Sequence, residues 1–81
     1  MEIDNAVLGH RLAEVRGLRR KTQDEAAVDM YMTREAISRR EQGKVDISAV
    51  ELINFMKLYR YRVEVFVSPD YRASDGMLPD E

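Results

Sequence analysis

The sequence predicts a small, mainly helical domain that ends in one β-strand. Apolar residues recur at helical spacing up to residue 60, capping residues divide that region into four segments, and the apolar period changes to two at residues 61–67. With 81 residues, one chain has a core of marginal size, so a second subunit would add stability. We therefore expect a helical domain at 1–60, a dimerisation strand at 61–68 and a disordered tail at 69–81.

The first predicted helix begins after Asp4 or Asn5, either of which can cap its N-terminus. Arg16 and residues 19–21 form its basic end, which suits the negative end of the helix dipole and is also available to phosphates. His10 has no Cys, His or carboxylate partner at the spacing of metal ligands, so we expect an ordinary helical residue there. The apolar face consists of Leu8, Leu12 and Val15.

Two short helices joined by a tight turn are predicted between Thr22 and Gly43. Thr22 and Glu25 form a T-x-x-E capping box, in which each side chain bonds a backbone N–H that the first turn leaves unpaired. Thr33 supplies a second N-cap, and Gly43 can end the second helix in the left-handed conformation. This arrangement is a helix-turn-helix, the unit whose second helix enters the major groove of DNA.

The outer face of the second helix carries residue types that read bases or bind phosphates. Arginine donates a bidentate fork to guanine, serine bonds several bases, and glutamate accepts from cytosine. A solvated charged face is the alternative, and the helix-turn-helix spacing favours contact with DNA. The net charge is −2, yet residues 11–45 hold nine Lys or Arg against six Asp or Glu. The candidate side chains on this face are Arg34, Glu35, Ser38 and Arg39.

Ser48 and Glu51 form another capping box, which predicts a fourth helix. Its wide apolar face, typical of a core helix, consists of Leu52, Ile53, Phe55, Met56 and Tyr59. Residues 61–67 then alternate in the manner of a strand, and no second strand is predicted to pair with it. Its natural partner is the same strand of another copy across a two-fold axis, and a fifth helix is the alternative. The dimerisation residues would be Tyr61, Val63, Val65 and Val67.

Residues 69–81 are polar and acidic and contain both Gly and Pro, which favours disorder. The sequence has no Cys, no apolar run long enough to span a membrane, and no signal-peptide pattern. It also shows no catalytic constellation, no cofactor-binding motif and no metal cluster. We therefore expect a cytoplasmic protein that is not an enzyme.

Three motifs carry a family resemblance: L-G-H-R-L-A-E-V-R, T-Q-D-E-A-A and I-S-R-R-E-Q-G-K. Through them the chain resembles the lambda-repressor/Cro-type (XRE) helix-turn-helix family from Leu8 to about Leu58. The resemblance implies a lambda-repressor-like fold of four helices, found in prokaryotes and phages, that binds double-stranded DNA. It implies that Gln23 touches a phosphate, that Arg34, Glu35 and Arg39 read bases, and that Lys44 touches the DNA backbone. Thr33 and Ser38 are also expected among the DNA-binding residues. It also implies an ion pair between Arg16 and Glu41.

Three positions depart from the family pattern. Tyr31 stands where the turn glycine is usual, Ala26 replaces a usual leucine, and Arg40 replaces an often apolar residue. Because a non-glycine residue at positive φ is strained, we expect the turn to be built slightly differently here.

A helix-turn-helix followed by a dimerising strand is similar to the HipB-type antitoxins. The sequence therefore predicts a homodimeric DNA-binding transcriptional regulator, a repressor, that acts on a pseudo-palindromic operator in the nucleoid. The alternative is an antitoxin that binds a toxin protein and represses its own operon.

Overall fold

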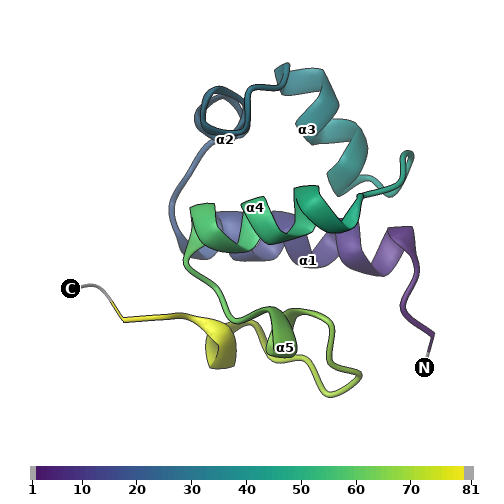
Figure 1. Cartoon of the computed structure of the whole chain (residues 1–81), viewed down its shortest axis with the longest axis vertical. Coiled ribbons are helices and arrows are strands. Elements are labelled where there is room, and N and C mark those ends of the chain that lie inside the picture. The colour runs from purple at the N-terminus through teal and green to yellow at the C-terminus, as the bar shows by residue number, and fades with distance from the viewer. Residues whose placement is uncertain (1, 80–81) are drawn as a thin grey trace.

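This computed structural model describes residues 2–79, which form five α-helices and one 3-10 turn (Figure 1). The elements are α1 (Asn5–Leu18), α2 (Gln23–Met30), α3 (Arg34–Glu41), α4 (Ala49–Tyr59), α5 (Val63–Phe66) and η1 (Ala73–Gly76). In Figure 1, α2 and α3 lie above α1 and α4, and α5 lies below them with the C-terminal segment. The fold is therefore mainly helical, as the sequence predicts.

Side-chain caps begin the first four helices. Asp4 accepts from the backbone N–H of the first turn of α1, and Thr33 does so for α3. Thr22 and Ser48 each take part in a complete capping box with the glutamate three residues later. Each cap contributes about 1 kcal/mol. The predicted starts of these four helices are confirmed.

The core lies where the four long helices meet α5. Its side chains include Tyr59, whose burial raises the pKa of the phenol and whose hydroxyl has no hydrogen-bond partner among the described residues. Ile53, predicted to belong to the apolar core face of α4, is exposed instead. The buried hydrophobic residues are Leu12, Val15, Ala26, Ala27, Ile37, Phe55, Met56, Tyr59, Tyr61 and Phe66.

The predicted strand at 61–67 is wrong, because Val63–Phe66 form the short helix α5. The alternating pattern placed Phe66 on the polar side, yet Phe66 is fully buried and its ring meets the edge of Tyr61 at 6.2 Å between centroids. In a strand, residues 61 and 66 would point to opposite faces, whereas the helical turn lets both rings pack together, so burial of Phe66 outweighs the strand preference of its valine neighbours. Tyr61 and Met77 form an isolated antiparallel bridge within the chain. The alternative of a fifth helix is confirmed.

The four residues assigned to strand dimerisation consequently have other roles. Tyr61 is buried in its own chain, and its hydroxyl donates to the Ala73 carbonyl at 2.7 Å. Val65 packs against the core, whereas Val63 and Val67 are exposed. The described fold therefore offers no strand at 61–67 that could pair across a dimer.

The described part of the predicted disordered tail, residues 69–79, is packed against the helices. The Leu78 N–H donates to the Arg60 carbonyl at 2.9 Å, and η1 contacts both α5 and α1. The pattern of polar residues, Gly and Pro does not reveal this, because two arginines, one in α1 and one at its C-cap, bind backbone carbonyl oxygens of this segment and of the residues just before it.

Arg11 is the first of these arginines, and the whole residue is only 4% exposed. Its Nη1 donates to the carbonyl oxygens of Phe66 at 2.8 Å and Ser68 at 2.9 Å, and its guanidinium lies 4.4 Å from the centre of the Tyr71 ring. Arg19 is the second, and it donates to the carbonyl oxygens of Tyr59, Arg60 and Leu78. Arg19, which belongs to the predicted basic end of the helix, thus stabilises the packing of the C-terminal segment.

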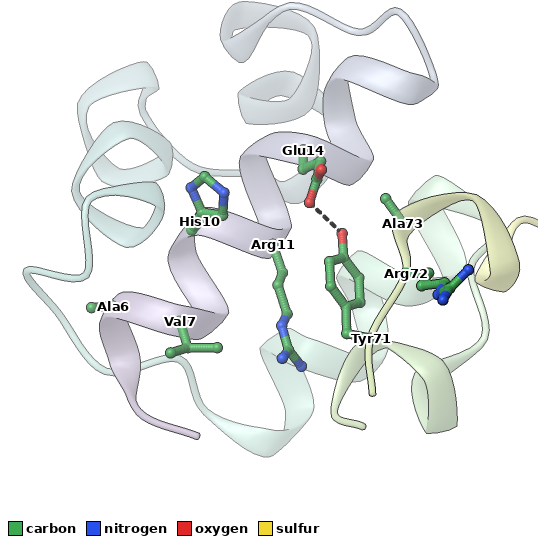
Figure 2. A pocket seen from close by; sticks show the side chains of 8 residues that line it. All are labelled: Ala6, Val7, His10, Arg11, Glu14, Tyr71, Arg72 and Ala73. Atoms are coloured by element: carbon green, nitrogen blue, oxygen red, sulfur yellow. Dashed lines mark hydrogen bonds between the residues drawn. The ribbon is translucent and has the colours of Figure 1, made fainter. Parts of the chain in front are cut away.

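An open cavity of about 600 Å³ lies between α1 and the C-terminal segment (Figure 2). Tyr71 points its hydroxyl across this cavity and donates to Oε1 of Glu14 at 2.8 Å. Burial, followed by the hydrogen bond to Glu14, raises the pKa of Tyr71. His10 lines the same cavity as an exposed helical residue. Together with Arg11 and Arg19, the Tyr71 hydroxyl therefore links α1 to the C-terminal segment.

Candidate nucleic-acid interface

Close contact with α1 fixes the position of α3. A Cβ atom built on Gly9 would lie 2.3 Å from the carbonyl oxygen of Arg40 and 2.7 Å from that of Glu41. Both are backbone atoms of α3, which cannot yield as a flexible side chain would. Gly43 ends α3 with φ at 74°, the left-handed conformation expected for it. The absence of a side chain at Gly9 therefore sets how closely α3 approaches the core.

Arg16 and Glu41 form the ion pair that the family resemblance implies. Arg16 Nε lies 2.7 Å from Glu41 Oε2, and Nη2 lies 3.0 Å from Oε1. The side chains are 19% and 7% exposed, so water screens the pair only partly. Hydrogen bonding to Glu41 raises the pKa of Arg16. The pair joins α1 to the C-terminal end of α3.

A second bidentate pair joins α3 to α4. Arg40 Nε lies 3.1 Å from Glu51 Oε1, and Nη2 lies 3.0 Å from Oε2. Hydrogen bonding from Arg40 holds the pKa of the Glu51 carboxyl below its ordinary value. The sequence interpretation gave Glu51 only a capping role and treated Arg40 as a departure. The pairing explains why an arginine is tolerated at an often apolar position.

The candidate base-reading residues are gathered at the N-terminal cap and outer face of α3. Arg34, Glu35 and Arg39 are exposed, while Ile37 on the opposite side is buried. Glu35 and Arg39 are four positions apart, as are Arg34 and Ser38, so each pair lies on one face of the helix. Within the described residues, the side chains of Glu35 and Arg39 have no hydrogen bond or ion pair.

Two of these residues have neighbours that the sequence interpretation missed. Arg34 Nε lies 3.9 Å from Asp24 Oδ1 of α2, and since both side chains are exposed this ion pair is weak. Ser38 is half-buried and accepts a hydrogen bond from Gln42 Nε2 at 2.8 Å. Gln42 extends the outer face by one turn. Its position four residues after Ser38 could have predicted that the two side chains lie on the same face.

The three predicted backbone-contacting or capping residues lie at the borders of this face. Thr33 is exposed, and its hydroxyl accepts from the Ala36 N–H at 3.0 Å as the cap of α3. Lys44 is exposed directly after the left-handed Gly43. Gln23, the first residue of α2, is half-buried, and its Nε2 donates to Glu41 Oε1 at 3.0 Å.

Tyr31 occupies the turn between α2 and α3 in the left-handed conformation, with φ at 56° and ψ at 43°. The turn is therefore built as a glycine would build it, contrary to the expected altered turn. Its side chain is 97% exposed, so it gains nothing from packing. We expect Tyr31→Gly to raise the free energy of unfolding by about 0.5–1 kcal/mol, because relief of strain exceeds the extra entropy of an unfolded glycine.

Urea denaturation of Tyr31→Gly and Tyr31→Ala checks this prediction. Alanine removes the ring but keeps the Cβ atom and the strain, so its unfolding midpoint should stay near that of the wild type. Equal stability of the two variants would mean that the turn is not strained.

Other kinds of site are not found in the described residues. No group of three or more His, Cys, Asp or Glu side chains there could hold a metal ion. Within the same range, no helix has the length and apolar character of a membrane span.

Comparisons with known proteins agree with this geometry. The family model for a helix-turn-helix domain matches residues 7–64. The restriction-modification controller protein C.AhdI from Aeromonas hydrophila is similar in structure, with a TM-score of 0.64 and 22% identity over 68% of this chain and 83% of that chain. The clp gene regulator ClgR from C. glutamicum has a TM-score of 0.69 and 17% identity over 93% of this chain and 84% of that chain. No curated protein sequence matches. Since the family model covers more than half of the sequence, the chain belongs to the helix-turn-helix domain family of the lambda-repressor/Cro type.

Proposed function

We propose that this protein is a sequence-specific transcriptional repressor that binds an operator as a homodimer. The observation that carries the proposal is the outer face of α3, where Arg34, Glu35 and Arg39 project from a helix that Gly9 and two bidentate ion pairs hold rigidly. Base readout needs donors and acceptors held on a fixed frame, and this face meets that condition. Of the similar structures reported above, ClgR is named as a clp gene regulator and C.AhdI as a restriction-modification controller protein.

We expect Arg34→Ala and Arg39→Ala each to weaken binding to the cognate operator by about 1–3 kcal/mol and to relax base preference at single positions. The reason is loss of a guanidinium fork that faces guanine. Gln23→Ala and Lys44→Ala should instead weaken binding to all duplexes alike, because phosphate contacts carry no sequence information. Fluorescence anisotropy with operator and random duplexes separates the two effects.

Arg62→Ala is the matched control, because Arg62 is an exposed arginine at the start of α5, remote in the chain from α3. It removes the same charge and should leave base preference intact. If the α3 variants lose affinity for operator and random DNA to the same extent, direct readout by these arginines is refuted.

A second copy is proposed to cover the exposed apolar side chains of α4 and α5. Ile53 and Val63 line one groove of about 310 Å³, and Val50 is exposed one turn before Ile53 on α4. The groove exposes apolar side chains, so the same surface of a second copy can pack against it, as a two-fold interface requires. The core of one chain is small, so this additional burial would stabilise the protein. This contact takes the place of the predicted strand pairing, because residues 63–66 are helical. It would present two α3 helices to half-sites about 34 Å apart.

Ile53→Glu is expected to yield a monomer in analytical ultracentrifugation and to lower operator affinity about a hundredfold, because the two half-sites are no longer linked. Val28→Glu is the control, since Val28 is an exposed valine on α2 outside the groove. Dimers of Ile53→Glu, or a monomeric wild type that binds the operator equally well, would exclude this interface.

The antitoxin alternative rested on the dimerising strand, and α5 occupies that segment. No described residue favours a toxin protein as partner over DNA. Copurification with the product of a co-expressed neighbouring gene would reopen that alternative.

A further inference from the structure

Glu41 accepts hydrogen bonds from two different helices at once. Arg16 of α1 donates to both of its carboxylate oxygens, and Gln23 of α2 donates to Oε1 at 3.0 Å. Arg16 also donates from Nη1 to the Lys21 carbonyl at 2.8 Å, just before α2 begins. A single carboxylate at the end of α3 therefore joins α3 to α1 and to the start of α2.

This arrangement fixes the orientation of the Gln23 amide. A carboxylate can only accept hydrogen bonds, so the NH₂ end of the amide must face Glu41. One N–H of Nε2 is used in this way, and the second can donate to a phosphate oxygen beyond the helix. An amide rotated by half a turn would place its carbonyl oxygen against the carboxylate, which is repulsive.

Arg16 allows Glu41, a negatively charged residue, to lie close to bound DNA. An uncompensated carboxylate beside a phosphate contact would repel the DNA backbone, whereas the bidentate guanidinium balances its charge. The Gln23 side chain is also ordered before DNA arrives, which removes part of the entropy cost of the contact.

We propose that Glu41 is a positioning residue that orients Gln23 to donate to a DNA phosphate. The inference rests on the proposed function and assigns Glu41 a role beyond its ion pair. It predicts an effect opposite in sign to simple electrostatics. On charge alone, removing a carboxylate should tighten DNA binding. We expect Glu41→Gln instead to weaken binding about fivefold, because the one acceptor oxygen of the new glutamine is used by Arg16 and none is left to orient Gln23.

The test is a double-mutant cycle on DNA affinity with Glu41→Gln, Gln23→Met and the double variant. Gln23→Met keeps the size of the side chain and removes the donor. In the wild-type background Glu41→Gln should weaken binding to a selected operator and to a random duplex alike, and in the Gln23→Met background it should cause no further loss. Glu64→Gln is the control, because it removes the same charge from an exposed residue of α5 that takes no part in the ion pairs of α3.

Tighter binding by Glu41→Gln, or the same change in both backgrounds, overturns the positioning role and leaves the proposed function intact. Failure of the wild type to bind any duplex overturns both. If Glu41→Gln does not fold, ¹⁵N relaxation of the wild-type Gln23 side-chain amide decides instead. An amide already rigid without DNA supports the proposal, and one that becomes rigid only with DNA overturns it.

Discussion

Gly9→Ala is expected to lower the free energy of unfolding by about 2–4 kcal/mol, whereas Gly17→Ala should raise it by up to about 1 kcal/mol. The two glycines lie in the same helix, α1, and differ in their surroundings. A Cβ on Gly9 would collide with the backbone of α3, while a Cβ on Gly17 would meet no atom within 4 Å. Helix propensity favours both substitutions, so the difference between them measures the contact between α1 and α3.

Thermal and urea denaturation of the two variants measures these changes. Gly9→Ala should also lose operator affinity below its unfolding midpoint, because α3 must move away from α1 to make room for the methyl group. Equal stabilisation by both substitutions would show that α1 and α3 are not in close contact.

Truncation of Glu41 or Arg16 to alanine is expected to cost about 3–5 kcal/mol, because each change leaves a poorly hydrated charge without its partner. The double variant should cost little more than either single one, since it removes both charges. Urea denaturation of all three variants gives the coupling energy. An exposed pair contributes only about 1 kcal/mol or less, so small and additive losses would refute a coupled pair.

The helix-turn-helix and the helix that follows it could be predicted because their determinants are close together in the sequence. Thr22, Thr33 and Ser48 cap their helices through backbone groups three residues away, and such local rules need no knowledge of the fold. The pair between Arg16 and Glu41 spans 25 positions, and it was predicted through family resemblance alone.

The C-terminal third could not be predicted because its structure depends on partners distant in sequence. Val63, Val65 and Val67 favour a strand, and the burial of Phe66 beside Tyr61 opposes this preference. A search for one apolar residue on the polar side of the alternation would have found Phe66.

The burial of Arg11 could be predicted from its position in the sequence. It lies three residues after Leu8 and four before Val15, the spacing of the buried face of α1. A charged residue on such a face needs hydrogen-bond partners from another segment, and these are the carbonyl oxygens of Phe66 and Ser68. Nothing in the sequence indicates that the carbonyl oxygens of Phe66 and Ser68 accept these hydrogen bonds.

Sequence-specific DNA binding is tested most directly by selecting duplexes from a random pool with the 81-residue chain. We expect enrichment of a pseudo-palindromic site with half-sites about 10 bp apart. The same selection with Arg39→Ala should relax preference at one position of each half-site. Recovery of the input pool without enrichment would contradict the proposal that this helix-turn-helix reads a DNA sequence.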